Sequence, residues 1–304
     1  MEAKNNKSHS EDYFISYRDH WWNRDFLDLM AQRWELQKYS TLLDVGCGIC
    51  HWSKILIPYL KNGAKVFAID SDEKSAQGSN ELHKYFADFD AEITFKTGNA
   101  HELEFDDDSF DVVTCQTVLI HLENPQKAVR EMYRVVKPGG KVICAEPNNS
   151  APSLIMDSIS RFRTIEEILE AVKYSILYEK GKILSAQGNN SIGDFVPEMF
   201  SKAGLKNIKV FLSDKAMPLL PPYQSIEQQA EIDGILEWKK TNSAVFDKQI
   251  AKRYFEALGD EYLQFFEEYW ENIVKQWNEI IEAISEKRFY SSGASLMYLV
   301  SGEK

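Results

Sequence analysis

Apolar and polar positions along the first half of the chain follow two alternating periods. Short apolar runs of the kind found in buried strands predict strands over residues 42–45, 65–70, 92–98, 110–117 and 141–147. Apolar residues at helical spacing predict helices between several of these strands, over residues 51–60, 72–89 and 125–136. This rhythm predicts an α/β fold with a Rossmann-like, doubly wound, mostly parallel sheet, whose ligands lie outside the carboxyl ends of the strands.

Beyond Pro147 the pattern becomes mainly helical. It predicts helices over residues 151–185, 195–204 and 214–288, with strands over 207–213 and 294–302. We therefore divide the chain into an N-terminal tail with aromatic cap helices (1–40), a core (41–213, including the helical segment 151–185), a helical insertion or lid (214–290) and a last strand (291–304). The aromatic-rich helices admit two interpretations, a cover over a ligand pocket or plain packing, and 214–290 is also a candidate dimer surface.

Composition narrows the class of protein. The 304 residues carry a formal net charge of −12, which argues against a general nucleic-acid binder. No apolar run is long enough to span a membrane, and the polar N-terminus lacks the apolar stretch of a signal peptide. We therefore expect a cytoplasmic protein whose four cysteines are reduced.

The stretch Thr41–His51, TLLDVGCGICH, carries the strongest local signal. An apolar run breaks at Gly46 and Gly48 before a helix, a geometry that lets backbone approach a ligand closely. The same residues contain a Cys-x-x-Cys-His motif, which is the spacing for c-type haem attachment and also suits a dithiol or half a zinc site. Haem attachment requires export, and zinc requires two further ligands, so we interpret these cysteines as small residues in a tight loop.

A dinucleotide site is the other alternative for this stretch. The pyrophosphate fingerprint Gly-x-Gly-x-x-Gly requires glycine where His51 stands, so a nicotinamide enzyme is disfavoured.

Asp44-Val-Gly-Cys-Gly resembles instead the glycine-rich loop of class I S-adenosylmethionine-dependent methyltransferases. Further matches to this family follow in order: Asp70 in AIDSD, Gly98-Asn-Ala after the third strand, FDVVTCQTVLIHL at 110–122, and RVVKPGG at 134–140. Together they cover about residues 41–150, and the core is most similar to small-molecule enzymes of the ubiquinone and menaquinone biosynthesis type. The resemblance implies a seven-stranded sheet with an antiparallel last strand, and S-adenosylmethionine as cofactor.

The resemblance also implies roles for individual residues. Asp70 is placed for the ribose hydroxyls, Asn99 for the adenine in place of the usual aspartate, and Asp44 for the methionine end through water or the loop amides. Cys50 replaces a third glycine that many members carry. The full set of expected cofactor-binding residues is Tyr17, Trp22, Asp44, Gly46, Cys47, Gly48, Asp70, Ser71, Asn99, Ala100 and Gln116. We expect no metal site.

Methyl transfer from a sulfonium is an in-line displacement that needs alignment and, only for some acceptors, a base. His121, after the fourth strand, and Glu146, at the end of the fifth, are the candidate catalytic residues. The acidic balance and the absence of an Asn-Pro-Pro-aromatic motif favour a small-molecule acceptor over nucleic acid. The alternative is a non-catalytic cofactor-binding or interaction module with the same fold, and a homodimer is compatible with either.

Overall fold

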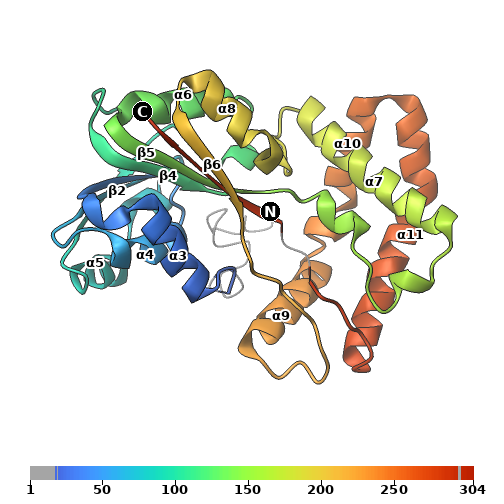
Figure 1. The fold of residues 1–304 in the computed structure, drawn as a ribbon. Helices are drawn as coiled ribbons and strands as arrows, with labels where there is room; N and C mark the ends of the chain where they lie inside the picture. The colour runs from blue at the N-terminus through green and yellow to red at the C-terminus, as the bar shows by residue number, and fades with distance from the viewer. Residues whose placement is uncertain (1–17, 19, 294–295) are drawn as a thin grey trace, which may run out of the picture.

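The computed structural model describes residue 18 and residues 20–293 and 296–304. Seven strands form one sheet in the order β3-β2-β1-β4-β5-β7-β6 (Figure 1). Their bounds are β1 Thr41–Val45, β2 Lys65–Asp70, β3 Glu92–Thr97, β4 Phe110–Gln116, β5 Val136–Pro147, β6 Lys206–Leu212 and β7 Met297–Glu303. Strands β1 to β5 are parallel, and β7 runs antiparallel between β5 and β6. The predicted fold class is therefore confirmed.

Helices cover both faces of the sheet, because the side chains of each strand alternate between two hydrophobic layers. One layer packs under α3, α4 and α5, and the other under α6 and α8 (Figure 1). The bounds of these helices are α3 Arg24–Trp34, α4 His51–Leu56, α5 Asn80–Ala87, α6 Pro125–Val135 and α8 Val196–Ala203. Short 3₁₀ turns add η1 Leu36–Lys38, η2 Ile57–Tyr59, η3 Ser75–Gln77, η4 Leu119–His121, η5 Ala151–Leu154, η6 Ser160–Phe162, η7 Ile192–Phe195 and η8 Ala244–Phe246.

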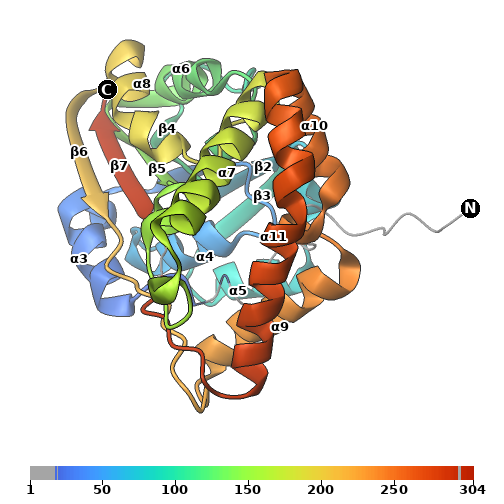
Figure 2. The same ribbon diagram turned by 90° about the vertical axis from the view of Figure 1, so that its right-hand side faces the viewer.

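A separate group of helices stands beyond the carboxyl end of β5 (Figures 1 and 2). It consists of α7 Ile165–Leu184, α9 Ile226–Thr241, α10 Lys248–Leu258 and α11 Asp260–Ser285. Aromatic side chains of α7 pack with those of α10 and α11 in one hydrophobic cluster. The helical group is thus built from two stretches of the chain, and α7, which the sequence division places in the core, packs within it. The division of the chain into domains itself stays a prediction.

Three helical predictions are wrong in part. The segment 72–89 breaks at Gly78, whose φ is +63° and where a Cβ would lie 2.3 Å from the Phe95 ring; Ser79 then caps α5. In 151–185 only α7 is an α-helix, because Thr164 begins it with a capping box. Residues 214–225 contain no helix, and α9 begins after the cap residue Ser225.

Within the described residues, no helix combines the length and the apolar character that a bilayer crossing needs.

Candidate functional site

The candidate site lies where the strand order reverses, at the carboxyl ends of β1 and β4, which is where ligands bind in doubly wound sheets. The chain leaves β1 through Gly46 at φ +68° and Gly48 at φ +50°, and reaches α4 through Cys50 at φ +61°. The Cys47 amide donates to the carbonyl of Ile69 on β2 at 2.9 Å. The glycine loop therefore passes through three residues in the left-handed backbone conformation and is hydrogen-bonded to the neighbouring strand β2.

Gly46 also has a steric reason to be glycine. A Cβ at this position would lie 2.5 Å from Cγ2 of Val118, a residue of the turn that follows β4. The two loops that border the switch point thus touch through a contact that leaves no room for a side chain at residue 46. Nothing in the sequence signals Val118, and sequence reasoning missed it.

Asp70 joins the glycine loop to the end of β2. Its Oδ2 accepts a hydrogen bond from the Gly48 amide at 2.8 Å, and its Oδ1 accepts one from the Asp72 amide at 2.9 Å. Each carboxylate oxygen can accept a further bond, and Asp70 is only half-buried. Ser71 next to it is exposed. The structure therefore brings Gly46, Gly48 and Asp70 together, with one carboxylate oriented by backbone amides.

Asp44 lies behind the loop. It is 1% exposed, and its Oδ2 accepts a hydrogen bond from the hydroxyl of Ser53 on α4. Burial raises the pKa of Asp44 to about 7. This buried carboxyl group joins β1 to α4 and can influence a ligand only by holding the glycine loop in place. Sequence reasoning did not identify Ser53 as its partner.

Asn99 follows β3, and its side chain is turned onto the chain ahead. Its Oδ1 accepts from the His101 amide at 2.9 Å and lies 3.1 Å from His101 Nδ1. Asn99 is exposed and Ala100 is half-buried. The side-chain oxygen expected to contact an adenine is engaged within its own loop.

Glu146 is fully buried at the end of β5. Its Oε1 accepts hydrogen bonds from the amides of Val118 and Leu119, each at 2.9 Å, while Oε2 has no hydrogen-bond partner among the described residues. Burial raises the pKa of Glu146 to about 7. Glu146 thus holds the turn after β4, the same turn whose Val118 contacts Gly46. His121 ends that turn as an exposed residue.

The other expected cofactor residues divide between loop and core. Gln116, half-buried, ends β4. Trp22 is 8% exposed and packs on Trp52 with ring centroids 5.2 Å apart, so it belongs to the core. Tyr17 lies outside the described residues.

The cysteines are buried free thiols on the two faces of the sheet: Cys47 and Cys50 in one hydrophobic layer, Cys115 and Cys144 in the other. A side-chain hydrogen bond with Cys50, together with burial, raises the pKa of Cys47, which disfavours the thiolate that metal binding or redox chemistry needs. In the part of the chain that the structure describes, no group of three His, Cys, Asp or Glu could hold a metal ion.

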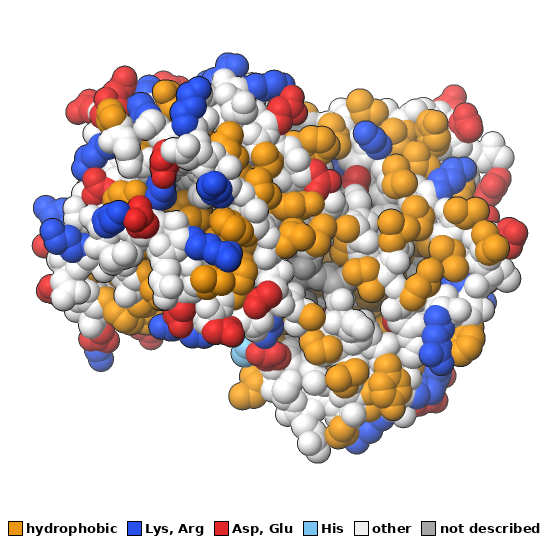
Figure 3. Space-filling view, in the orientation of Figure 1, with side chains coloured by type: hydrophobic (Ala, Val, Ile, Leu, Met, Phe, Trp, Pro, Cys, Tyr) orange, Lys and Arg blue, Asp and Glu red, His pale blue; other side chains and the backbone are white. Residues whose placement is uncertain are grey.

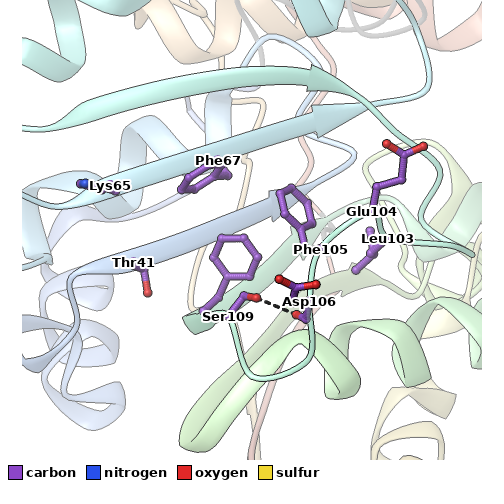
Figure 4. A pocket seen from close by; sticks show the side chains of 9 residues that line it. Thr41, Lys65, Phe67, Leu103, Glu104, Phe105, Asp106 and Ser109 are labelled. Carbon is purple, nitrogen blue, oxygen red and sulfur yellow. Dashed lines mark hydrogen bonds between the residues drawn. The ribbon is translucent and has the colours of Figure 1, made fainter.

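A cavity of about 590 Å³ lies at the other end of the sheet. It is lined by Thr41, Lys65, Phe67, Leu103, Glu104, Phe105, Asp106, Ser109 and Phe110 (Figure 4). Thr41 and Lys65 are the first residues of β1 and β2, whereas the glycine loop follows the last residue of β1. This cavity is therefore separate from the candidate site.

Comparisons with known proteins identify relatives of this chain. A family model described as a methyltransferase domain matches residues 43–144. The demethylmenaquinone methyltransferase of Anoxybacillus flavithermus is 31% identical over 201 residues, which are 64% of this chain and 81% of that protein. The protein of the same name from Oceanobacillus iheyensis is 30% identical over 214 residues, 67% of this chain and 84% of its own.

Among solved structures, a putative methyltransferase from Bacillus halodurans superposes with a TM-score of 0.51 at 20% identity, covering 92% of this chain and 99% of that one. This likeness shows the fold.

Proposed function

This chain belongs to the class I S-adenosylmethionine-dependent methyltransferases, and from this premise we propose that it binds S-adenosylmethionine at the glycine loop and transfers the methyl group to a small-molecule acceptor. The observation that carries the proposal is the junction of Gly48 and Asp70, where a loop amide holds a half-buried carboxylate at the end of β2. The bound cofactor supplies an already activated methyl group. The protein's own work is to hold the donor, align the acceptor and exclude water.

The residues fit this cofactor in three respects. The left-handed glycines expose loop backbone at the switch point, which suits close approach by a polar ligand. Asp70 offers one free acceptor site on each oxygen, which suits the two hydroxyls of a ribose. Residues after β3 then border the place proposed for the adenine; because the Asn99 oxygen is engaged by His101, we assign this contact to the exposed surface of the 99–100 segment.

For the acceptor side, we propose that the helical group, including the predicted lid 214–290, covers the substrate. His121 is the candidate base for acceptors that must lose a proton, since it is exposed at the turn after β4. Glu146 is a positioning residue in this proposal, because its carboxylate is buried and holds the amides of that turn. The net charge of −12 supports a small molecule rather than a nucleic acid as acceptor.

Calorimetric titration with S-adenosylmethionine, and separately with NAD, tests the cofactor. Saturable binding of S-adenosylmethionine alone is expected, and Asp70→Ala should weaken it at least about tenfold because both hydroxyl contacts and the anchor of the Gly48 amide are lost. Asp106→Ala is the matched control, an exposed aspartate at the opposite end of the sheet that should leave the affinity unchanged. Binding of NAD alone, or an unchanged affinity in Asp70→Ala, contradicts the proposal.

Turnover requires a second experiment. Isotopically labelled methyl groups should pass from S-adenosylmethionine to a small product in a cell extract supplied with the wild-type protein, and not with Asp70→Ala. A protein that binds the cofactor but labels no product under any condition would instead be the non-catalytic binding module.

A further inference from the structure

Helix α7 is apolar on two opposite faces. Its inner face packs Tyr174 and Tyr178 into the cluster with α10 and α11. Its outer face carries the large apolar residues Ile165, Leu169, Ile176 and Ile183, which are 71%, 62%, 48% and 42% exposed. At 3.6 residues per turn these four lie within about 40° of one another, roughly opposite Tyr174. An apolar helix face normally packs against another element, and the described residues leave this outer face exposed.

Neighbouring segments extend this apolar surface. Turn η5 lies against α7. Its last residue, Leu154, is an exposed apolar residue, and so are Ile155, Met156 and Phe162 between this turn and α7. Figure 3 shows hydrophobic side chains gathered across the face of the molecule that carries α7 in Figure 1. We define the α7 face as Leu154, Ile155, Met156, Phe162, Ile165, Leu169, Ile176, Ile183 and Leu184.

The size of the α7 face exceeds what monomers expose. Eight of its nine residues are aliphatic, so with about 150–200 Å² for each fully exposed side chain, the lower part of the range for aromatic residues, their exposed fractions correspond to roughly 800–1,000 Å². The largest apolar patch of a typical monomer is about 300–600 Å². A standard stable interface buries about 800 Å² on each partner. The area is therefore that of a protein–protein interface.

The charges around the α7 face indicate which partner fits. By helical position, the exposed charges that flank the outer face are Glu166 towards its N-terminal end and Lys180 towards its C-terminal end, whereas exposed Glu167 and Glu170 lie on the side of Tyr174. One flanking charge of each sign on the helix is not the cluster of basic residues that a surface for anionic lipid carries. The charges are also ordered along the helix, with glutamates in its N-terminal half and Lys180 near its C-terminus, an order that complements itself when reversed.

We propose that the chain forms a homodimer in which two α7 helices pack antiparallel through the α7 face. A two-fold axis near Lys173 places Glu166 of each copy opposite Lys180 of the other, and the outer isoleucines of one copy's N-terminal half against those of the other's C-terminal half. Within the described residues, neither Glu166 nor Lys180 makes an ion pair in its own chain. Lys173 sits on the axis with its ammonium directed away, 4.1 Å from the Phe265 ring of α11.

Sedimentation velocity over a range of protein concentrations tests the proposal on the full chain. The wild type should dimerise. Leu169→Glu combined with Ile176→Glu should raise the dimer dissociation constant at least about tenfold, because both changes bury charges at the centre of the contact. Leu236→Glu on α9, 44% exposed in the single chain and outside the α7 face, is the matched control and should not change it.

A charge-reversal cycle distinguishes this arrangement from other dimers. Glu166→Lys and Lys180→Glu should each weaken the dimer several-fold, and the double variant should restore it. Residues 166 and 180 are about 21 Å apart along one helix, so any rescue must occur between copies. A wild type that remains monomeric, a dimer insensitive to the double glutamate variant, or variants without rescue would each overturn the proposal, as would neutral-lipid vesicles binding the α7 face of a monomer. Cofactor titration in the same samples separates these outcomes from failure of the proposed function.

Discussion

Substitution of Gly46 by alanine tests the contact between the two loops at the switch point. A new Cβ meets Val118 Cγ2 at 2.5 Å, and the backbone holds φ at +68°, which L residues rarely adopt. The left-handed conformation alone costs about 1–2 kcal/mol. Overpacking against Val118 adds about 1–3 kcal/mol. We therefore expect Gly46→Ala to lower the free energy of unfolding by about 2–5 kcal/mol.

Urea denaturation followed by tryptophan fluorescence measures this loss. Gly63→Ala is the matched control, because Gly63 has φ +76° and no atom within 4 Å of an added Cβ, so it isolates the backbone cost. Val118→Ala in the Gly46→Ala background should remove the clash and leave only that backbone cost, giving a coupling of about 1–3 kcal/mol between the two sites. If the glycine loop binds S-adenosylmethionine as proposed, Gly46→Ala should also weaken that binding, and adding Val118→Ala should restore it. The reasoning is refuted if Gly46→Ala costs no more than Gly63→Ala, or if Val118→Ala brings no recovery.

Two further predictions concern pH. The pKa of Asp44 is raised from 3.8 to about 7 in the folded chain, so between about pH 4 and 7 this carboxyl group is ionised in the unfolded chain but still protonated in the folded one. The free energy of unfolding therefore falls as the pH rises through this window, and above it the loss reaches about 4 kcal/mol. Asp44→Asn should therefore be more stable than the wild type in urea at pH 8 and equal to it at pH 4; equal stability at pH 8 would contradict the assignment. Burial alone would raise the pKa of Asp111, but hydrogen bonds from Lys137, Ser40 and Thr41 lower it to about 2. Its contribution is present above about pH 4 and lost as the pH falls through 2. Asp111→Asn should thus lose stability at pH 7 but not at pH 2, and a loss of the same size at both would argue against the ionised pair.

The sheet was predictable because its strands are marked by apolar runs between turns. Strands β1 to β4 and the last strand, β7, lie within a few residues of their predicted places. Strand β5 ends where predicted but begins at Val136 rather than at residue 141. The residues predicted as a turn belong to the start of this strand. The ammonium of Lys137 binds the carboxylate of Asp111 on β4, and Gly140 packs against the backbone carbonyl of Asp111. These are contacts between distant residues, and local propensity carries no record of them.

The candidate site was predictable where it depends on glycine and acidic residues at fixed places. Gly48 and Asp70, which the family resemblance assigned to the same cofactor, share a hydrogen bond across 22 positions. Val118 was not predictable, because an apolar residue after a strand has no distinctive pattern. The role of Glu146 depends on two backbone amides of another loop, which a sequence does not place.

The sequence order of the two halves has a consequence for how such a protein can change. Every residue that we assign to the donor precedes Pro147, whereas α7 and α9–α11 all follow it. The sheet crosses this boundary, because β7 pairs with β5 over seven registered positions and closes onto β6. Helix α7, between β5 and β6, and helices α9–α11, between β6 and β7, can therefore change in length while α8 still covers the sheet and the donor residues keep their places. Under the proposal that the helical group covers the acceptor, recombination at these two junctions gives access to new acceptors, while the strand pairs on either side keep the two halves in register.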